Sequence, residues 1–125
     1  MDAFQHVNNV VYFRYFESAR IAYFGRLNLV EFMDRAGIGP ILASAQCKFK
    51  IPLTYPDTVS VGTRISSVEQ DRFVMEYVVV SHRYHKVAAE GVGVLVSYNY
   101  REQKKTVIPP ELKQRILDVE GLARD

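Results

Sequence analysis

Several features are scarce or absent in this sequence. Its single cysteine, Cys47, rules out an internal disulfide, which is typical of a reducing compartment. No uninterrupted apolar run approaches the roughly 18–20 residues that span a membrane, and the opening Met-Asp-Ala-Phe-Gln-His lacks the features of a secretory signal. The 16 basic and 14 acidic residues leave a formal charge of +2, which is too small to indicate nucleic-acid binding. We therefore expect a cytoplasmic protein with no membrane or nucleic-acid partner.

The residues that are present indicate one folded unit. The chain has 125 residues, of which 48% are hydrophobic and 24% charged, and it contains no repeat or flexible linker. A chain of this length can bury a sizeable core without disulfides, so we expect a single domain over residues 1–125. Aromatic residues are prominent, with eight tyrosines and seven phenylalanines but no tryptophan.

The first part of the chain has helical periodicity. Apolar residues recur every three or four positions from Asn8 to about Gly25, which predicts a long helix. A second, short helix is expected from Val30 to Ala36, because Gly37 suits a left-handed cap at its end.

After residue 40 the period is two. Alternation predicts four long antiparallel strands, at about 43–51, 59–65, 73–83 and 87–99. In the first of them we expect one buried face, formed by Ala43, Ala45, Cys47, Phe49 and Ile51. A terminal helix is expected at Pro110–Leu117. Together these elements predict an α+β fold in which a curved antiparallel sheet wraps around one long central helix.

Four polar residues, Asp2, His6, Asn8 and Asn9, stand immediately before the aromatic helix. They have two interpretations. Such residues cap helices and interact with the helix dipole. Alternatively, free N–H groups at the helix start could hold an anionic intermediate while the carboxylate acts as base or nucleophile.

The segment around these residues resembles a known family. Asp2-Ala3-Phe4-Gln5-His6-Val7-Asn8-Asn9-Val10-Val11-Tyr12-Phe13, followed by Tyr15-Phe16-Glu17-Ser18-Ala19-Arg20, is similar to the D-x-x-G-H-V-N-N-x-x-Y…F-E-x-A-R opening of hotdog-fold acyl-CoA thioesterases. The similarity is to the 4-hydroxybenzoyl-CoA thioesterase-like branch, and Tyr55–Val61 resembles the family's turn into its next strand. The resemblance implies a hotdog fold. It also implies a first strand before the aspartate, which is apparently missing from this chain.

The resemblance also implies catalytic roles. Asp2 matches the catalytic aspartate, which acts as general base on water or attacks the thioester directly. Asn9 matches the position whose backbone N–H stabilises the oxyanion, and His6 is expected to orient the loop or the water. The sequence departs from the family pattern at Gln5, where the family has glycine, and Phe4 replaces an asparagine of the plant carrier-protein thioesterases. This chemistry needs no metal or cofactor.

We further expect substrate contacts from Asn8, from Tyr12 and Phe16 along one edge of the helix, and from Arg83. Arg83, with His82, His85 and Lys86, forms either a solvated turn or a basic contact for the phosphates of coenzyme A. The spare rings Phe13, Tyr15 and Phe24 suggest a partner surface, which agrees with the family's dimers, so a homodimer or homotetramer is expected.

Other residues receive structural interpretations. The histidines at 6, 82 and 85 do not have the spacing of a metal site. Cys47 is expected to fill the core, Glu17 to pair with Arg20, and the Gly91-Val92-Gly93 segment to allow close packing of the sheet on the helix.

The functional prediction is hydrolysis of an acyl-CoA or acyl-carrier-protein thioester. Two alternatives remain open, a non-enzymatic acyl-CoA-binding module and a hydroxyacyl-thioester dehydratase.

Overall fold

The computed structural model describes residues 9–121. The helices are α1 (Asn9–Arg26), α2 (Leu29–Ala36) and α3 (Pro110–Glu120), and the long strands are β1 (Ile38–Phe49), β2 (Val59–Val68), β3 (Arg72–Ser81) and β4 (Lys86–Asn99). A two-residue strand, β5 (Lys104–Lys105), was not predicted. The predicted absence of a first strand before Asp2 concerns a part of the chain outside the described residues. No helix within residues 9–121 is long and apolar enough to cross a membrane.

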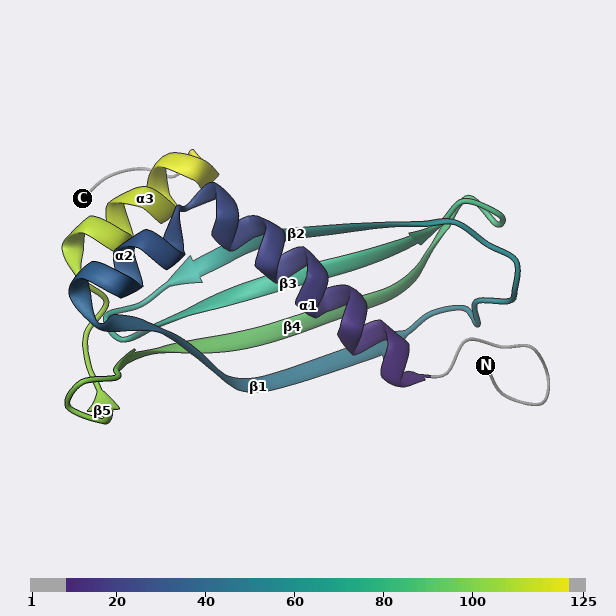
Figure 1. Cartoon of the computed structure of the whole chain (residues 1–125). Helices are drawn as coiled ribbons and strands as arrows, with labels where there is room; N and C mark the ends of the chain where they lie inside the picture. The colour runs from purple at the N-terminus through teal and green to yellow at the C-terminus, as the bar shows by residue number, and fades with distance from the viewer. Residues whose placement is uncertain (1–8, 122–125) are drawn as a thin grey trace.

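The four long strands form one antiparallel sheet in the order β1-β4-β3-β2, and β5 pairs with the end of β4. Helix α1 crosses one face of this sheet, whereas α2 and α3 lie together at one end of it (Figure 1). The first turn of α1 lies toward the opposite end, where the β3–β4 hairpin turns (Figure 1). The predicted α+β fold, with a sheet packed around one long helix, is confirmed.

Strand β3 shows how the sequence pattern builds the core. Its residues alternate without exception between buried and half-buried positions, because successive side chains point to opposite faces of a sheet. Phe73, Met75, Tyr77 and Val79 are buried and belong to the same core cluster as Tyr12 and Phe16 of α1.

Two glycines of β4 leave room for this packing. A Cβ on Gly91 would lie closer than 3 Å to the ring of Phe16, and one on Gly93 would lie 2.9 Å from the Tyr77 hydroxyl. Real Cβ atoms do not approach other atoms so closely, so α1 can sit this near to the sheet only over glycine at position 91, while Gly93 makes room for the Tyr77 side chain of β3. The predicted role of the Gly91-Val92-Gly93 segment in packing the sheet on the helix is confirmed for Gly91.

Helix α3 fastens the far end of α1 to the sheet. The Glu120 carboxylate accepts a short hydrogen bond from the Tyr23 hydroxyl and another, of 3.0 Å, from the Ile65 backbone N–H. Burial, followed by this hydrogen bond, raises the pKa of Tyr23. One N–H of the β2 edge is thereby covered by the chain itself.

Strand β1 differs from its prediction. It begins at Ile38, before the expected start at residue 43, and runs through Gly39 and Pro40. Ala43 and Ala45 are exposed and Phe49 is 44% exposed, so the expected buried face is wrong for these residues. The physical reason is position, because β1 is an edge strand with no strand on its outer side within residues 9–121. At its end the Phe49 ring contacts Tyr12 of α1 on one side only and stays partly exposed. Cys47, as predicted, packs partly against the core.

Candidate functional site

The start of α1 carries the predicted catalytic motif. Asn9 is the first residue of the helix and is exposed, whereas Asp2, His6 and Asn8 lie outside the described residues. The first N–H groups of an α-helix have no partner within the helix and carry its positive dipole end. The described part of the motif can therefore present hydrogen-bond donors to an anion.

Tyr12 is buried one turn after Asn9. It is 2% exposed and packs edge-on against Phe49, with 5.0 Å between ring centroids. Burial raises the pKa of the Tyr12 hydroxyl, and a hydrogen bond with the Leu53 backbone acts in the opposite direction. Tyr12 thus ties the first turn of α1 to the segment that follows β1.

Phe16 lies one turn further along α1 and is also 2% exposed. It stacks on Tyr77 with 4.7 Å between centroids. Beside it, the Arg20 guanidinium donates to the Tyr77 hydroxyl over 2.9 Å and not to Glu17, so the expected Glu17–Arg20 pair is wrong. Tyr12 and Phe16 are thus core residues of the chain.

Arg83 lies in the exposed hairpin between β3 and β4, far along the chain from the motif. Its backbone N–H and the Ser81 hydroxyl both donate to the Asp57 carboxylate, and the hydrogen bond from Ser81 is the main cause that lowers the pKa of Asp57. The Arg83 guanidinium donates to Thr54 Oγ1 over 3.3 Å and stacks 5.5 Å from the centre of the Tyr84 ring. Sequence reasoning missed Thr54 and Tyr84, because nothing in the alternation pattern brings them together.

A hollow beside this hairpin has a volume of about 430 Å³. It is lined by the following residues: Ile51, Pro52, Thr54, Tyr84 and Lys86. We call it the hairpin hollow.

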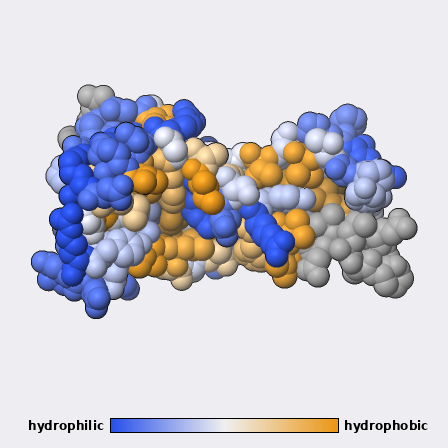
Figure 2. All heavy atoms as spheres, viewed as in Figure 1, coloured by the Kyte–Doolittle hydropathy of each residue, from blue (hydrophilic) through white to orange (hydrophobic). Residues whose placement is uncertain are grey.

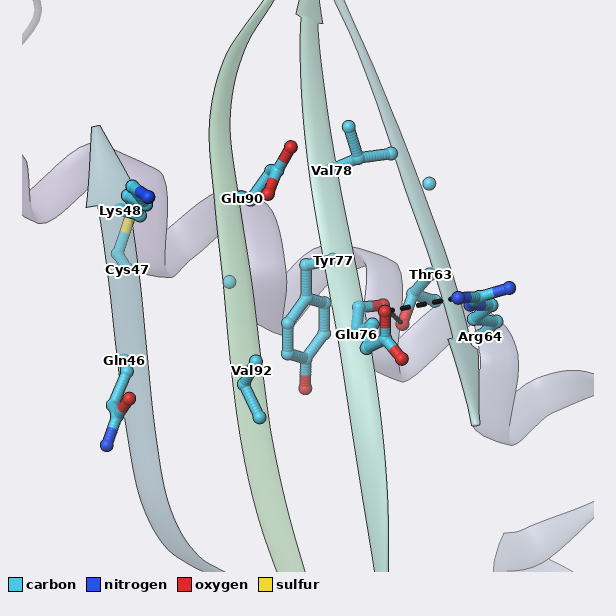
Figure 3. A pocket seen from close by; sticks show the side chains of 12 residues that line it. Gln46, Cys47, Lys48, Thr63, Arg64, Glu76, Tyr77, Val78, Glu90 and Val92 are labelled. Carbon is cyan, nitrogen blue, oxygen red and sulfur yellow. Dashed lines mark hydrogen bonds and ion pairs between the residues drawn. The ribbon is translucent and has the colours of Figure 1, made fainter. Parts of the chain in front are cut away.

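A larger hollow, of about 750 Å³, lies on the sheet face that points away from α1 (Figure 3). Its side chains come from neighbouring strands at matching register, with Lys48 opposite Glu90 and Arg64 opposite Glu76. The Arg64–Glu76 ion pair spans 3.2 Å, and Val78 and Val92 lie between the charges (Figure 3). Glu76 pairs with Arg64, and Glu90 lies 3.9 Å from Lys50, so this broad surface offers no concentrated negative charge to a substrate.

The described part of the chain contains no candidate metal site. Within residues 9–121, no three His, Cys, Asp or Glu side chains lie close enough together to hold a metal ion.

Apolar side chains also reach the surface. Phe13 is 41% exposed, whereas Tyr15 and Phe24 are half-buried against the core, so only the first of the three predicted spare rings is exposed. Leu42 and Phe49 add exposed apolar area along β1. Figure 2, viewed from the side on which α1 crosses the sheet, shows hydrophobic surface along the narrow middle of the molecule.

Comparison with known proteins adds to this geometry. The sequence model of the thioesterase-like superfamily matches residues 1–116. The long-chain acyl-CoA thioesterase FadM of Escherichia coli K12 is 19% identical over 116 residues, which cover 93% of this chain and 88% of FadM.

Solved structures show the same fold. A thioesterase from Thermus thermophilus, in complex with coenzyme A and zinc, has a TM-score of 0.81 and 29% identity over 98% of this chain and 88% of that one. A gentisyl-coenzyme A thioesterase has a TM-score of 0.77 and 24% identity over 93% of this chain and 90% of that one.

Proposed function

Because this chain belongs to the thioesterase-like superfamily, with a hotdog fold, we propose that it is an acyl-CoA thioesterase that forms one domain over residues 1–125. One observation carries the proposal: the family match spans residues 1–116 and includes the whole motif from Asp2 to Arg20. The reaction adds water to the thioester, breaks the C–S bond, and releases a free acid and coenzyme A. The free thiol of Cys47 agrees with a cytoplasmic setting.

The proposed mechanism uses the start of α1. Asp2 either removes a proton from water, which attacks the thioester carbonyl, or attacks that carbon itself. The oxyanion that develops is stabilised by the backbone N–H of Asn9 and by the positive end of the helix. The thiolate then leaves and takes up a proton. If Asp2 is the nucleophile, water finally hydrolyses the acyl anhydride on Asp2, which releases the acid and restores the carboxylate. His6 positions the loop or the water in this scheme.

The substrate contacts follow from the same placement. Asn8 adjoins Asn9, and one edge of the Tyr12 and Phe16 rings faces the acyl group in our proposal. Their burial in the core supports a role as a rigid wall. Arg83 supplies a cation for a phosphate of coenzyme A.

The proposal is tested by measuring thiol release from a panel of acyl-CoA esters of different chain length and aromaticity. We expect the wild-type protein to release one thiol for each acid formed. Binding of acyl-CoA without thiol release would instead favour a binding module. Loss of water from a hydroxyacyl-CoA to give the enoyl ester, with the thioester intact, would favour a dehydratase.

We also propose that the protein is a homodimer or homotetramer that associates through β1. One side of β1 pairs with β4, and no strand within residues 9–121 pairs with its other side. Unpaired edges of long apolar strands are templates for another chain. The β2 edge is less suited to pairing, because the Ile65 backbone N–H already donates a hydrogen bond to the Glu120 carboxylate.

The β1 interface predicts a change of mass on mutation. The Lys50 backbone N–H donates to the Ala88 carbonyl of β4. Because backbone N–H groups alternate in direction along a strand, the N–H of Ala45, five residues earlier, points away from β4. We expect Ala45→Pro, which removes that N–H, to convert the oligomer to a 14.3 kDa monomer in sedimentation experiments. Ala45→Val, which keeps the N–H, should remain oligomeric. A monomeric wild-type protein at tens of micromolar would contradict the proposal.

A further inference from the structure

The hairpin hollow has the residues of a binding site for a flat, phosphorylated group. Its lining includes the apolar residues Ile51 and Pro52 and Tyr84, which is 40% exposed. Lys86, at the start of β4, also lines the hollow and is exposed. An aromatic face beside a flexible cation is a combination that suits a nucleotide, whose base stacks and whose phosphates attract lysine and arginine.

Hydrogen bonds hold Tyr84 in place. The hydroxyls of Thr54 and Tyr84 lie 2.8 Å apart, and Arg83 donates to the same Thr54 oxygen. The Tyr84 backbone N–H donates to Ser81 Oγ, and Ser81 in turn donates to Asp57. The ring therefore belongs to a network that joins the hairpin to the segment after β1, which limits the entropy lost on binding.

The local charge favours an anion. Arg83 and Lys86 lie three positions apart at the β3–β4 hairpin, and His82 and His85 lie beside them in the sequence. The nearby carboxylate of Asp57 already accepts from Ser81 and from the Arg83 backbone. These hydrogen bonds partly offset the negative charge of Asp57, whereas the Lys86 side chain is exposed to solvent.

The position of the hollow connects it with the proposed active site. Ile51, Pro52 and Thr54 line the hollow, while Leu53 between them is buried in the core. The Leu53 backbone hydrogen-bonds to Tyr12 in the first turn of α1. The hairpin and the start of α1 also lie toward the same end of the sheet (Figure 1).

We propose that the hairpin hollow binds the adenosine 3′,5′-bisphosphate end of coenzyme A. The adenine contacts Tyr84, and Lys86 with Arg83 contacts the phosphates. This inference rests on the proposed function and makes it more specific. Carrier proteins hold their acyl groups on a phosphopantetheine arm that lacks this nucleotide, so the hollow selects coenzyme A esters over carrier-protein esters.

Three variants test the hollow. Tyr84→Leu removes the aromatic face, Lys86→Gln removes a cation that lines the hollow, and Lys113→Gln removes an exposed cation from α3, at the other end of the sheet. Adenosine 3′,5′-bisphosphate is the binding probe, measured by calorimetry. We expect Tyr84→Leu and Lys86→Gln each to weaken binding about tenfold, and Lys113→Gln to leave it within about twofold.

Kinetics with paired substrates complete the test. For the same acyl group, the first two variants should lower kcat/KM about tenfold with the coenzyme A ester and leave it unchanged with the pantetheine ester. Equal losses with both esters, or no binding of the bisphosphate to the wild-type protein, would overturn the inference. Bisphosphate binding that the variants weaken, without any thioester hydrolysis, would refute the proposed function and leave the hollow's assignment standing. Hydrolysis that the variants leave unchanged would do the reverse.

Discussion

Gly91→Ala is expected to destabilise the protein by about 2–3 kcal/mol, because overpacking a filled core costs about 1–3 kcal/mol and the new methyl group meets rigid neighbours. The ring of Phe16 and the Gln46 carbonyl oxygen, at 3.1 Å, both lie in its path. Phe16 cannot simply turn aside, since it is buried and stacked on Tyr77. Urea unfolding followed by circular dichroism would measure the loss.

A matched control separates this clash from a general effect of alanine in a strand. Gly62 lies in β2, where a Cβ would meet only the Val78 side chain at 3.3 Å. We expect Gly62→Ala to change the free energy of unfolding by less than about 1 kcal/mol, since the backbone entropy it saves offsets a mild contact. Adding Phe16→Leu to Gly91→Ala should recover part of the stability by shortening the ring. Equal unfolding midpoints for Gly91→Ala and the wild-type protein would contradict the packing that we describe.

Much of the fold was predictable because local patterns and the tertiary structure agree. The predicted long helix appears as α1 from Asn9, and the predicted left-handed cap appears at Gly37, whose N–H donates to Met33. The alternation in β3 and β4 reflects a face covered by α1. Along the outer edge strand the same alternation was misleading: Ala43 and Ala45 are exposed, and Phe49 is 44% exposed although its ring contacts Tyr12 of α1. Periodicity indicates which residues share a face and does not indicate whether another element covers that face.

The surroundings of the candidate site were less predictable, because they depend on contacts between distant residues. Thr54 meets Tyr84 thirty positions away, and Arg20 meets Tyr77 across 57 positions and not its neighbour Glu17. Neither contact has a local sequence signal. The Asp2 motif could be found because its residues lie within a few positions of one another and resemble a family pattern. The basic residues Arg83 and Lys86 could be noted in the sequence, but the hollow that Thr54 and Tyr84 line beside them could be found only in three dimensions.

Asp2→Asn is expected to lower kcat for acyl-CoA hydrolysis by at least about a hundredfold, since general acid–base groups typically contribute 10²–10⁴-fold. Asparagine has nearly the size of aspartate and can neither accept the proton of water nor form the acyl anhydride. The substitution therefore removes the chemistry in both versions of the mechanism. A thiol-release assay at saturating substrate measures kcat directly.

The binding step should be unaffected, because Asp2 is assigned to the reaction and the nucleotide contacts lie at the β3–β4 hairpin. We expect the affinity of Asp2→Asn for coenzyme A to stay within about threefold of the wild-type value, as for loss of an interaction made only in the transition state. Asp34→Asn makes the same chemical change at an exposed position of α2 and should keep full activity. If Asp2→Asn retained the wild-type kcat, the thioester would have to be attacked with the help of another group, and the assignment of α1's first residue Asn9 as oxyanion donor would lose its main support. A large fall in kcat with unchanged coenzyme A binding would instead place the reacting carbonyl beside the start of α1, with the nucleotide held separately.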